Sequence, residues 1–293
     1  MSKGYIAIAQ NSGESDYIKM AYALALSIKS TQSEVSNFAV CVTDPSSVPT
    51  EYLHAFDHVI QIPWDDHAKN SNWKIENKWK YYYMTPFEET VILDCDMVFL
   101  SDVSYWWGIL SNKDVWFTTN VRTFKNEIVT SDFYRKTFTS NDLPNVYTAF
   151  FYFKKSTMAS EIFKLTEIIY QNWERFYYDF LDETRPKHVS GDVCFALAVK
   201  ILGIENECTS NLESMPTFVH MKSFVQNIPN KMLSEIWTEH IPTYFTYDGQ
   251  LKVNNFAQIL PFHYHRKEWL SDDIIAKLEG KLDGIRRRNE NSG

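Results

Sequence analysis

The stretch VILDCDMVFL, residues 91–100, places two carboxylates inside a run of apolar residues. Val, Ile and Leu in succession are typical of a parallel strand that is buried on both faces. An ionised aspartate in such a strand carries a large desolvation cost unless it is paired with a cation or bound to a metal ion. Asp94 and Asp96 are therefore expected where the strand ends, because open α/β sheets bind their ligands beyond the carboxyl ends of their strands.

Strand and helix patterns alternate on both sides of this stretch. Strands are predicted at residues 4–10, 37–44, 58–64, 91–93, 146–155, 217–221 and 259–265. Helices are predicted at residues 16–30, 49–56, 159–173 and 191–202, and from residue 72 to near Pro86. This alternation predicts an α/β fold, with a mostly parallel twisted sheet flanked by helices and Asp-x-Asp at a strand end. With no linker or repeat, one domain is expected over residues 1–285, followed by a disordered tail at 286–293.

Composition and charge exclude several classes of protein. Of 293 residues, 44% are hydrophobic, with only 9 Gly and 10 Pro, which indicates a globular chain rather than a disordered one. The net charge of −8 argues against a broad surface for nucleic acid or anionic membrane. Without a leader pattern or a long apolar run, a soluble cytoplasmic protein is expected. The four cysteines are scattered singly, which predicts reduced packing residues rather than a zinc site.

Two carboxylates at a strand end make hard oxygen ligands, which suit Mg²⁺ or Mn²⁺ completed by substrate phosphates. Asp-x-Asp alone is a common pattern, and its alternative interpretation is a structural aspartate that caps a loop. No Gly-rich phosphate-binding loop accompanies it in this sequence.

The wider segment NKWKYYYMTPFEETVILDCDMVFLSD, residues 77–102, resembles the core of a known enzyme family. These are the retaining nucleotide-sugar glycosyltransferases of the glycogenin and lipopolysaccharide galactosyltransferase type. The segments at residues 6–29 (IAIAQNSGESDYIKMAYALALSIK), 190–198 (SGDVCFALA) and 261–269 (PFHYHRKEW) are similar to further elements of that family. The resemblance covers most of residues 4–270, extends to glycosyltransferases of tailed phages, and implies a single GT-A domain.

This resemblance implies a metal site. Asp94 and Asp96 would hold Mn²⁺ or Mg²⁺ on the diphosphate of the sugar donor, with Asp94 also near the donor ribose or sugar. His263 would be the third ligand, a role that imidazole can fill for Mn²⁺. The alternative for His263 is a structural partner or a zinc ion, and no role is assigned to His265 or His220.

The resemblance also implies three catalytic residues. Lys78 and Lys267 would contact the diphosphate or donor sugar, and Asp192 would face the transferred sugar and the acceptor. The family's late element usually has Pro where this chain has Glu268. The alternatives are a solvated helix lysine for Lys78 and an ordinary helix N-cap for Asp192.

At the nucleotide end, the family's first loop corresponds to Ala9, Gln10 and Asn11, and Tyr17 is a candidate to stack on the base. Bulky Tyr147 stands where the family tends to have Asn, so the resemblance does not carry over the identity of the sugar.

The function expected from the resemblance is transfer of a hexose or pentose from a nucleoside diphosphate sugar, most simply a UDP-sugar, to an acceptor hydroxyl with retention. The acceptor is either a glycan or small molecule, or a hydroxymethylated base in phage DNA. A DNA acceptor would use the lysines Lys69, Lys74 and Lys80. Two roles are possible for the tryptophans, stacking on a sugar or packing in the core; these residues are Trp64, Trp73, Trp106 and Trp107. The rival functions are a non-catalytic nucleotide-sugar binding protein and a nucleotidyltransferase with the same metal site.

Overall fold

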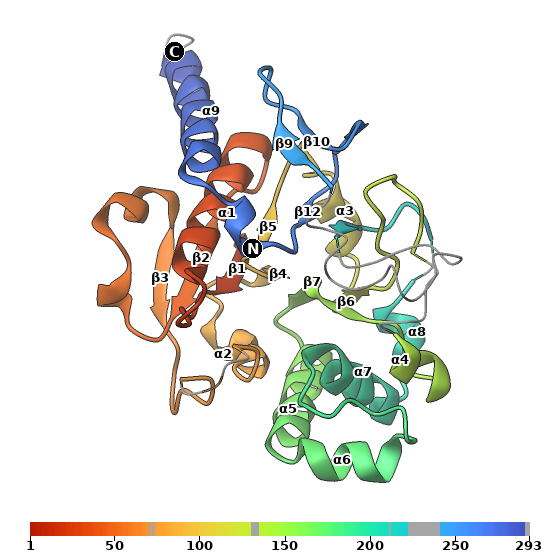
Figure 1. Cartoon of the computed structure of the whole chain (residues 1–293). Coiled ribbons are helices and arrows are strands. Elements are labelled where there is room, and N and C mark those ends of the chain that lie inside the picture. The colour runs from red at the N-terminus through yellow and green to blue at the C-terminus, as the bar shows by residue number, and fades with distance from the viewer. Residues whose placement is uncertain (70, 72–73, 130–134, 211, 222–240, 291–293) are drawn as a thin grey trace.

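The computed structural model describes residues 1–69, 71, 74–129, 135–210, 212–221 and 241–290. Its centre is a six-stranded sheet with the strand order β3-β2-β1-β4-β7-β6 (Figure 1). The strands are β1 (Lys3–Ile8), β2 (Phe38–Val42), β3 (His58–Gln61), β4 (Glu89–Leu93), β6 (Val115–Thr118) and β7 (Tyr147–Lys154). The first four strands of the order run parallel, and β7 is antiparallel to both β4 and β6.

Helices cover both faces of this sheet. On one face, Tyr5 and Ala7 of β1 belong to the same buried cluster as α1 (Tyr17–Thr31) and α9 (Asp272–Glu290). On the other face, Ile6 packs with α5 (Thr157–Gln171) and α7 (Gly191–Leu202). The two layers lie on opposite sides of the sheet because successive side chains of a strand point in opposite directions (Figure 1).

The remaining helices are short. They are α2 (Tyr81–Met84), α3 (Trp106–Leu110), α4 (Lys136–Ser140), α6 (Trp173–Phe180) and α8 (Glu205–Cys208). Short 3₁₀ turns occur at Pro45–Ser47, Thr50–Ala55, Lys78–Lys80 and Lys267–Trp269.

Two small sheets complete the fold. One has the order β5 (Met97–Val98), β12 (Phe262–His263) and β8 (Val219–His220), with β12 antiparallel to β5 and parallel to β8. The other is antiparallel and contains β9 (Thr243–Phe245), β10 (Leu251–Val253) and β11 (Phe256–Ala257). In the first sheet His263 pairs with Met97, so a residue near the end of the chain lies beside the segment that follows β4.

The predicted α/β single domain with a mostly parallel sheet and flanking helices is confirmed. The helix predicted from residue 72 to Pro86 is wrong at the start of its described part: residues 74–77 form turns, Lys78–Lys80 a 3₁₀ turn, and α-helix covers only Tyr81–Met84. Polar side chains compete with helix here, because Lys74 Nζ donates to the Ala68 carbonyl at 2.7 Å and Asn77 Nδ2 to Asp66 Oδ1 at 2.7 Å. The helix predicted at 49–56 is a 3₁₀ turn.

The last helix continues past the predicted domain boundary at residue 285. Helix α9 runs to Glu290, with an i,i+3 ion pair between Arg286 and Asp283 at 3.9 Å. Residues 286–290 are thus helical rather than the start of a disordered tail. None of the helices in the described ranges is both long enough and apolar enough to cross a membrane.

Candidate metal and nucleotide site

The Asp-x-Asp motif lies where β4 leaves the sheet. The Asp94 amide donates to the Ala149 carbonyl at 3.0 Å, which extends the β4–β7 ladder by one residue. The chain then crosses to β5, and the β5–β12 pairing brings His263 next to the motif. One ligand atom each from Asp94, Asp96 and His263 lie within 4.8 Å of one another.

Asp96 is held in its ionised form. Its Oδ1 atom lies 3.0 Å from His263 Nε2, and its Oδ2 atom accepts a hydrogen bond from Lys267. Burial disfavours the charged carboxylate, but the His263 ring and the Lys267 ammonium outweigh burial and lower the pKa of Asp96 well below its ordinary value.

Asp94 has a lysine partner of its own. Lys78 Nζ donates to Asp94 Oδ1 at 2.7 Å and to Thr148 Oγ1 at 3.3 Å. Lys78 is only 8% exposed, so the alternative of a solvated helix lysine is wrong. Although burial opposes the charge, the Asp94 carboxylate raises the pKa of Lys78, and the ammonium stays protonated at neutral pH.

The donor set fits a divalent cation. Two carboxylates and an imidazole are ligands that Mn²⁺ accepts, and Mg²⁺ prefers the carboxylates with water and phosphate oxygens. His263 Nδ1 is buried without a hydrogen-bond partner in the described part of the chain. The other ring nitrogen, Nε2, lies 3.0 Å from Asp96 Oδ1 and is the atom that the ring turns toward the Asp-x-Asp motif.

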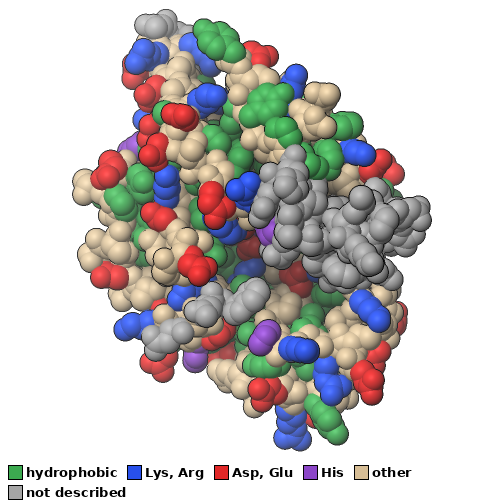
Figure 2. All heavy atoms as spheres, in the orientation of Figure 1, with side chains coloured by type: hydrophobic (Ala, Val, Ile, Leu, Met, Phe, Trp, Pro, Cys, Tyr) green, Lys and Arg blue, Asp and Glu red, His purple; other side chains and the backbone are tan. Residues whose placement is uncertain are grey.

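Asp94, Asp96, Lys78 and Lys267 face one cavity of about 180 Å³, and His263 is not among its described lining residues. Gln10 and Tyr17, predicted at the nucleotide end, also line it, as does Lys74, which was considered for DNA contact. Figure 2 shows a hollow near the middle of the molecular face in which acidic and basic side chains lie close together. Gln10, Tyr17 and the two lysines predicted to contact phosphate thus meet in a single space at the carboxyl ends of β1 and β4.

At the other end of this cavity, Gln10 belongs to a hydrogen-bond network. Its Nε2 atom donates to Thr43 Oγ1 and to the carboxylate of Asp66, each at 2.9 Å. Its Oε1 atom accepts from Asn77 Nδ2 at 2.9 Å. Burial opposes ionisation of Asp66, but hydrogen bonds from Thr43 and Gln10 lower its pKa. The sequence analysis missed Asp66, because its one local signal is the polar run WDDHAK at residues 64–69, which is typical of any loop that follows a strand.

The remaining predicted nucleotide residues take different places. The Ala9 amide donates to the Cys41 carbonyl at 2.7 Å, and Ala9 is buried. Asn11 Oδ1 accepts from the Ile18 amide at 3.0 Å and so supports the first turn of α1. Tyr17 lines the cavity, with Lys267 Nζ 5.7 Å from its ring centre.

Replacing Asp66 with alanine is expected to destabilise the fold by about 1–3 kcal/mol, because buried partners on Gln10 and Asn77 lose their acceptor. Urea unfolding of the two proteins measures this difference. Asp65→Ala is the matched control, since the exposed Asp65 side chain has no hydrogen-bond partner among the described residues. Equal losses for both variants would contradict the network.

Asp192 lies beside the cavity and is joined to it through Thr148. Its Oδ1 atom accepts from the Thr148 amide at 2.9 Å and from Thr148 Oγ1 at 2.6 Å, and Oδ2 accepts from Arg135 at 2.6 Å. Burial disfavours its charge, but Arg135 and Thr148 lower the pKa of Asp192. The N-cap interpretation is wrong, because Ser190 is the N-cap of α7 and Asp192 lies in its first turn.

Arg135 is the second residue that the sequence analysis missed. Besides Asp192, it donates to Asn145 Oδ1 at 2.7 Å, and its guanidinium lies 4.0 Å from the centre of the Tyr147 ring. It therefore fixes the start of β7. Nothing in the local sequence marks Arg135, since its partners are 10 to 57 residues away.

The tryptophans considered for sugar stacking differ in burial, and the lysines considered for DNA contact differ in their partners. Trp106 and Trp107 are buried at 4% and 2% exposure, as packing residues, whereas Trp64 is 65% exposed; Trp73 lies outside the described residues. The Lys80 ammonium is fully buried on the carbonyls of Pro63 and Asp65, and Lys74 Nζ binds the carbonyls of Ala68 and Lys69. Two of the three lysines thus hold their own loop together.

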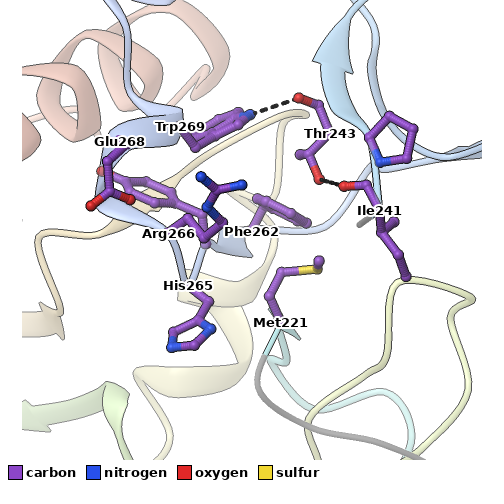
Figure 3. A pocket seen from close by; sticks show the side chains of 10 residues that line it. Met221, Ile241, Thr243, Phe262, His265, Arg266, Glu268 and Trp269 are labelled. Atoms are coloured by element: carbon purple, nitrogen blue, oxygen red, sulfur yellow. Dashed lines mark hydrogen bonds between the residues drawn. The ribbon is translucent and has the colours of Figure 1, made fainter. Parts of the chain in front are cut away.

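A second cavity, of about 290 Å³, lies beside the segment that carries Lys267 (Figure 3). Arg266, Glu268 and Trp269 line it, and Trp269 Nε1 donates to the Thr243 carbonyl at 3.1 Å. Lys267 instead faces Asp96, so neighbouring residues of this segment serve two different spaces.

The fold of this chain, with a mostly parallel sheet and the Asp-x-Asp motif near a strand end, is the GT-A fold that solved glycosyltransferase structures share. Among solved structures, the chain is similar to mouse xyloside xylosyltransferase 1 in its apo form, with 9% identity, a TM-score of 0.50, and coverage of 90% of this chain and 98% of that one. It is also similar to the galactosyltransferase LgtC in complex with donor and acceptor sugar analogs, with 11% identity, a TM-score of 0.53, and coverage of 94% and 95%. No family model and no curated protein matches the sequence.

Proposed function

We propose that this protein is a metal-dependent glycosyltransferase that moves a sugar from a nucleoside diphosphate, UDP in the simplest case, to an acceptor hydroxyl with retention of anomeric configuration. One observation carries the proposal. Asp94, Asp96 and His263 offer ligand atoms within 4.8 Å of one another, and the two aspartates line one cavity together with Lys78 and Lys267. A diphosphate needs this combination of cation ligands and ammonium groups.

When bound, Mn²⁺ or Mg²⁺ would supply Lewis-acid stabilisation of the charge on the leaving diphosphate. The two lysines assist the same step. Lys78 and Lys267 are now paired with Asp94 and Asp96, and they exchange those carboxylates for phosphate oxygens when the donor and cation enter. Positioned ammonium groups in a partly dry cavity stabilise a departing anion more strongly than the same groups in water.

Asp192 acts in this proposal as a positioning residue. Both of its carboxylate oxygens already accept hydrogen bonds, and its lowered pKa makes it a weak proton acceptor. By holding the amide and hydroxyl of Thr148, it places the Thr148 side chain against Lys78. Its contribution to transfer is thus the geometry of Lys78.

Two rival functions are disfavoured by what the chain carries. A nucleotidyltransferase would normally add a Gly-rich phosphate loop, which the sequence lacks. A binding protein without turnover could share the same cavity, and it differs in one measurable property, because metal-dependent hydrolysis of a donor requires a competent site.

Isothermal titration calorimetry with a panel of nucleoside diphosphates tests the proposal, in Mn²⁺ and again in EDTA. We expect UDP to bind in Mn²⁺ and to lose at least about tenfold in affinity when EDTA removes the cation. Slow hydrolysis of a UDP-sugar in Mn²⁺ separates an enzyme from a binding protein. Failure of every nucleoside diphosphate to bind under either condition would overturn the proposed function.

A further inference from the structure

Two exposed aromatic side chains, Trp64 on the loop after β3 and Tyr83 on α2, lie against the buried ring of Trp79, and the proposed donor site does not use them. Trp64 is 65% exposed and stacks on the Trp79 ring at 5.9 Å with an interplanar angle of 6°. Tyr83, 40% exposed, meets the Trp64 ring edge-on at 5.1 Å. We call Trp64, Trp79 and Tyr83 the aromatic platform.

The backbone that presents Trp64 is strained. Its φ angle is 59°, in the left-handed region that bulky side chains rarely adopt. The buried Lys80 ammonium holds this conformation, because it donates to the carbonyls of the residues on either side, Pro63 and Asp65. Strain that surrounding structure maintains is concentrated at functional sites, and here it presents an indole that is 65% exposed.

A cavity of about 150 Å³ adjoins the platform, and Trp79 lines it together with His67, Glu76 and Trp173. Glu76 is half-buried, yet it has no hydrogen bond or ion pair within the described ranges. The His67 ring lies 6.2 Å from the Trp79 ring, and its nitrogens have no hydrogen-bond partner among the described residues. The cavity thus combines aromatic faces with a carboxylate and an imidazole that are free to accept or donate hydrogen bonds.

Hydrogen-bonding side chains lie beside the platform. The Asp65 side chain is exposed next to Trp64, and Glu76 lines the adjoining cavity. The Lys74 and Lys80 ammonium groups bind backbone carbonyls and keep their charge, and Lys80 Nζ lies 5.4 Å from the centre of the Trp79 ring. A neutral saccharide fits, because its C–H faces stack on aromatic rings and its hydroxyls bond to carboxylate and imidazole groups.

The platform is also connected to the donor cavity. Asp66, two residues after Trp64, is hydrogen-bonded to Gln10, which lines that cavity. We infer that the aromatic platform and its adjoining cavity bind a neutral saccharide chain, whose unreactive sugars rest there while its end receives the transferred sugar. This inference rests on the proposed function, since it names the class of acceptor.

The test is binding of the full chain, with UDP and Mn²⁺ present, to an array of immobilised neutral oligosaccharides. We expect Trp64→Ala to lose at least tenfold of the binding and Trp64→Phe to retain most of it. Tyr105→Ala is the matched control, because Tyr105 is 64% exposed at the start of α3, away from the platform. Labelled single-stranded and duplex DNA, at low salt, provide the polyanion arm.

The outcomes separate the two proposals. If UDP binds but no glycan is retained, or Trp64→Ala retains glycan as well as the unchanged protein, the inference is overturned and the proposed function stands. DNA binding that depends on Trp64 would also overturn it. If UDP does not bind while glycan binding depends on Trp64, the saccharide surface stands and the transferase proposal fails.

Discussion

Asp96→Asn is expected to weaken the binding of UDP in the presence of Mn²⁺ by about 100-fold or more. The change removes one charged ligand from a set of three. Even loss of a group that only supports a ligand costs about 10–100-fold in metal affinity. It also leaves the Lys267 ammonium without its carboxylate partner in a site where Asp96 is only 14% exposed. Calorimetry with UDP and Mn²⁺ measures the effect directly.

Asp102→Asn is the matched control for this variant. Asp102 follows the same stretch of sequence, but its carboxylate caps the next turn by accepting from the Ser104 amide at 2.9 Å. We expect its UDP affinity to stay within about twofold of the unchanged protein, since surface changes away from a site have small effects. If Asp96→Asn binds UDP and Mn²⁺ as well as the Asp102 variant, the metal is not held by this motif.

Asp192→Ala is expected to destabilise the fold by about 3 kcal/mol. Removing one partner of a buried ion pair costs about 3–5 kcal/mol, because the other charge stays buried without compensation. The lower end applies here, since Arg135 is 11% exposed and Asp192 26% exposed in their side chains. Urea unfolding at pH 7 measures the loss. A double variant, Asp192→Ala with Arg135→Met, should recover part of it because no charge is left unpaired.

The same pair predicts a pH dependence. Because the folded state lowers the pKa of Asp192 from 3.8, the unfolded chain takes up the proton first as pH falls. The stabilisation is therefore complete above the unfolded pKa and is lost as pH falls towards the folded one. Asp192→Asn should flatten this acid branch of the stability curve. An unchanged acid branch, or a loss below about 1 kcal/mol for Asp192→Ala, which is typical of exposed pairs, would contradict the structural pair.

Local patterns predicted the sheet and the centre of the site. The apolar run that ends in Asp94 and Asp96, and the strand–loop–helix unit that carries Gln10 and Tyr17, are each written within a few neighbouring residues. Their placement follows from the rule that parallel strands present their carboxyl ends on one edge of the sheet.

What the sequence did not reveal depends on contacts between distant loops. The side-chain partners of Asp66 and Arg135 lie 10 to 57 residues away, and no periodicity marks such pairs. The failed helix prediction has the same origin. The apolar spacing after residue 74 is helical, but the Lys74 and Asn77 side chains bond to the loop at 66–69 and hold the chain in turns. Tertiary hydrogen bonds thus outweighed local propensity.

The short segment from β12 to Trp269 contributes residues both to the candidate metal site and to a neighbouring cavity. It supplies His263 and Lys267 to the metal side, while Arg266, Glu268 and Trp269 line the neighbouring cavity. A molecule that binds in the neighbouring cavity and shifts this segment alters the affinity of the candidate metal site for its cation. By thermodynamic reciprocity, the bound cation alters the affinity of the cavity for that molecule by the same factor. Binding at one of these two sites would therefore affect binding at the other through fewer than ten residues of backbone.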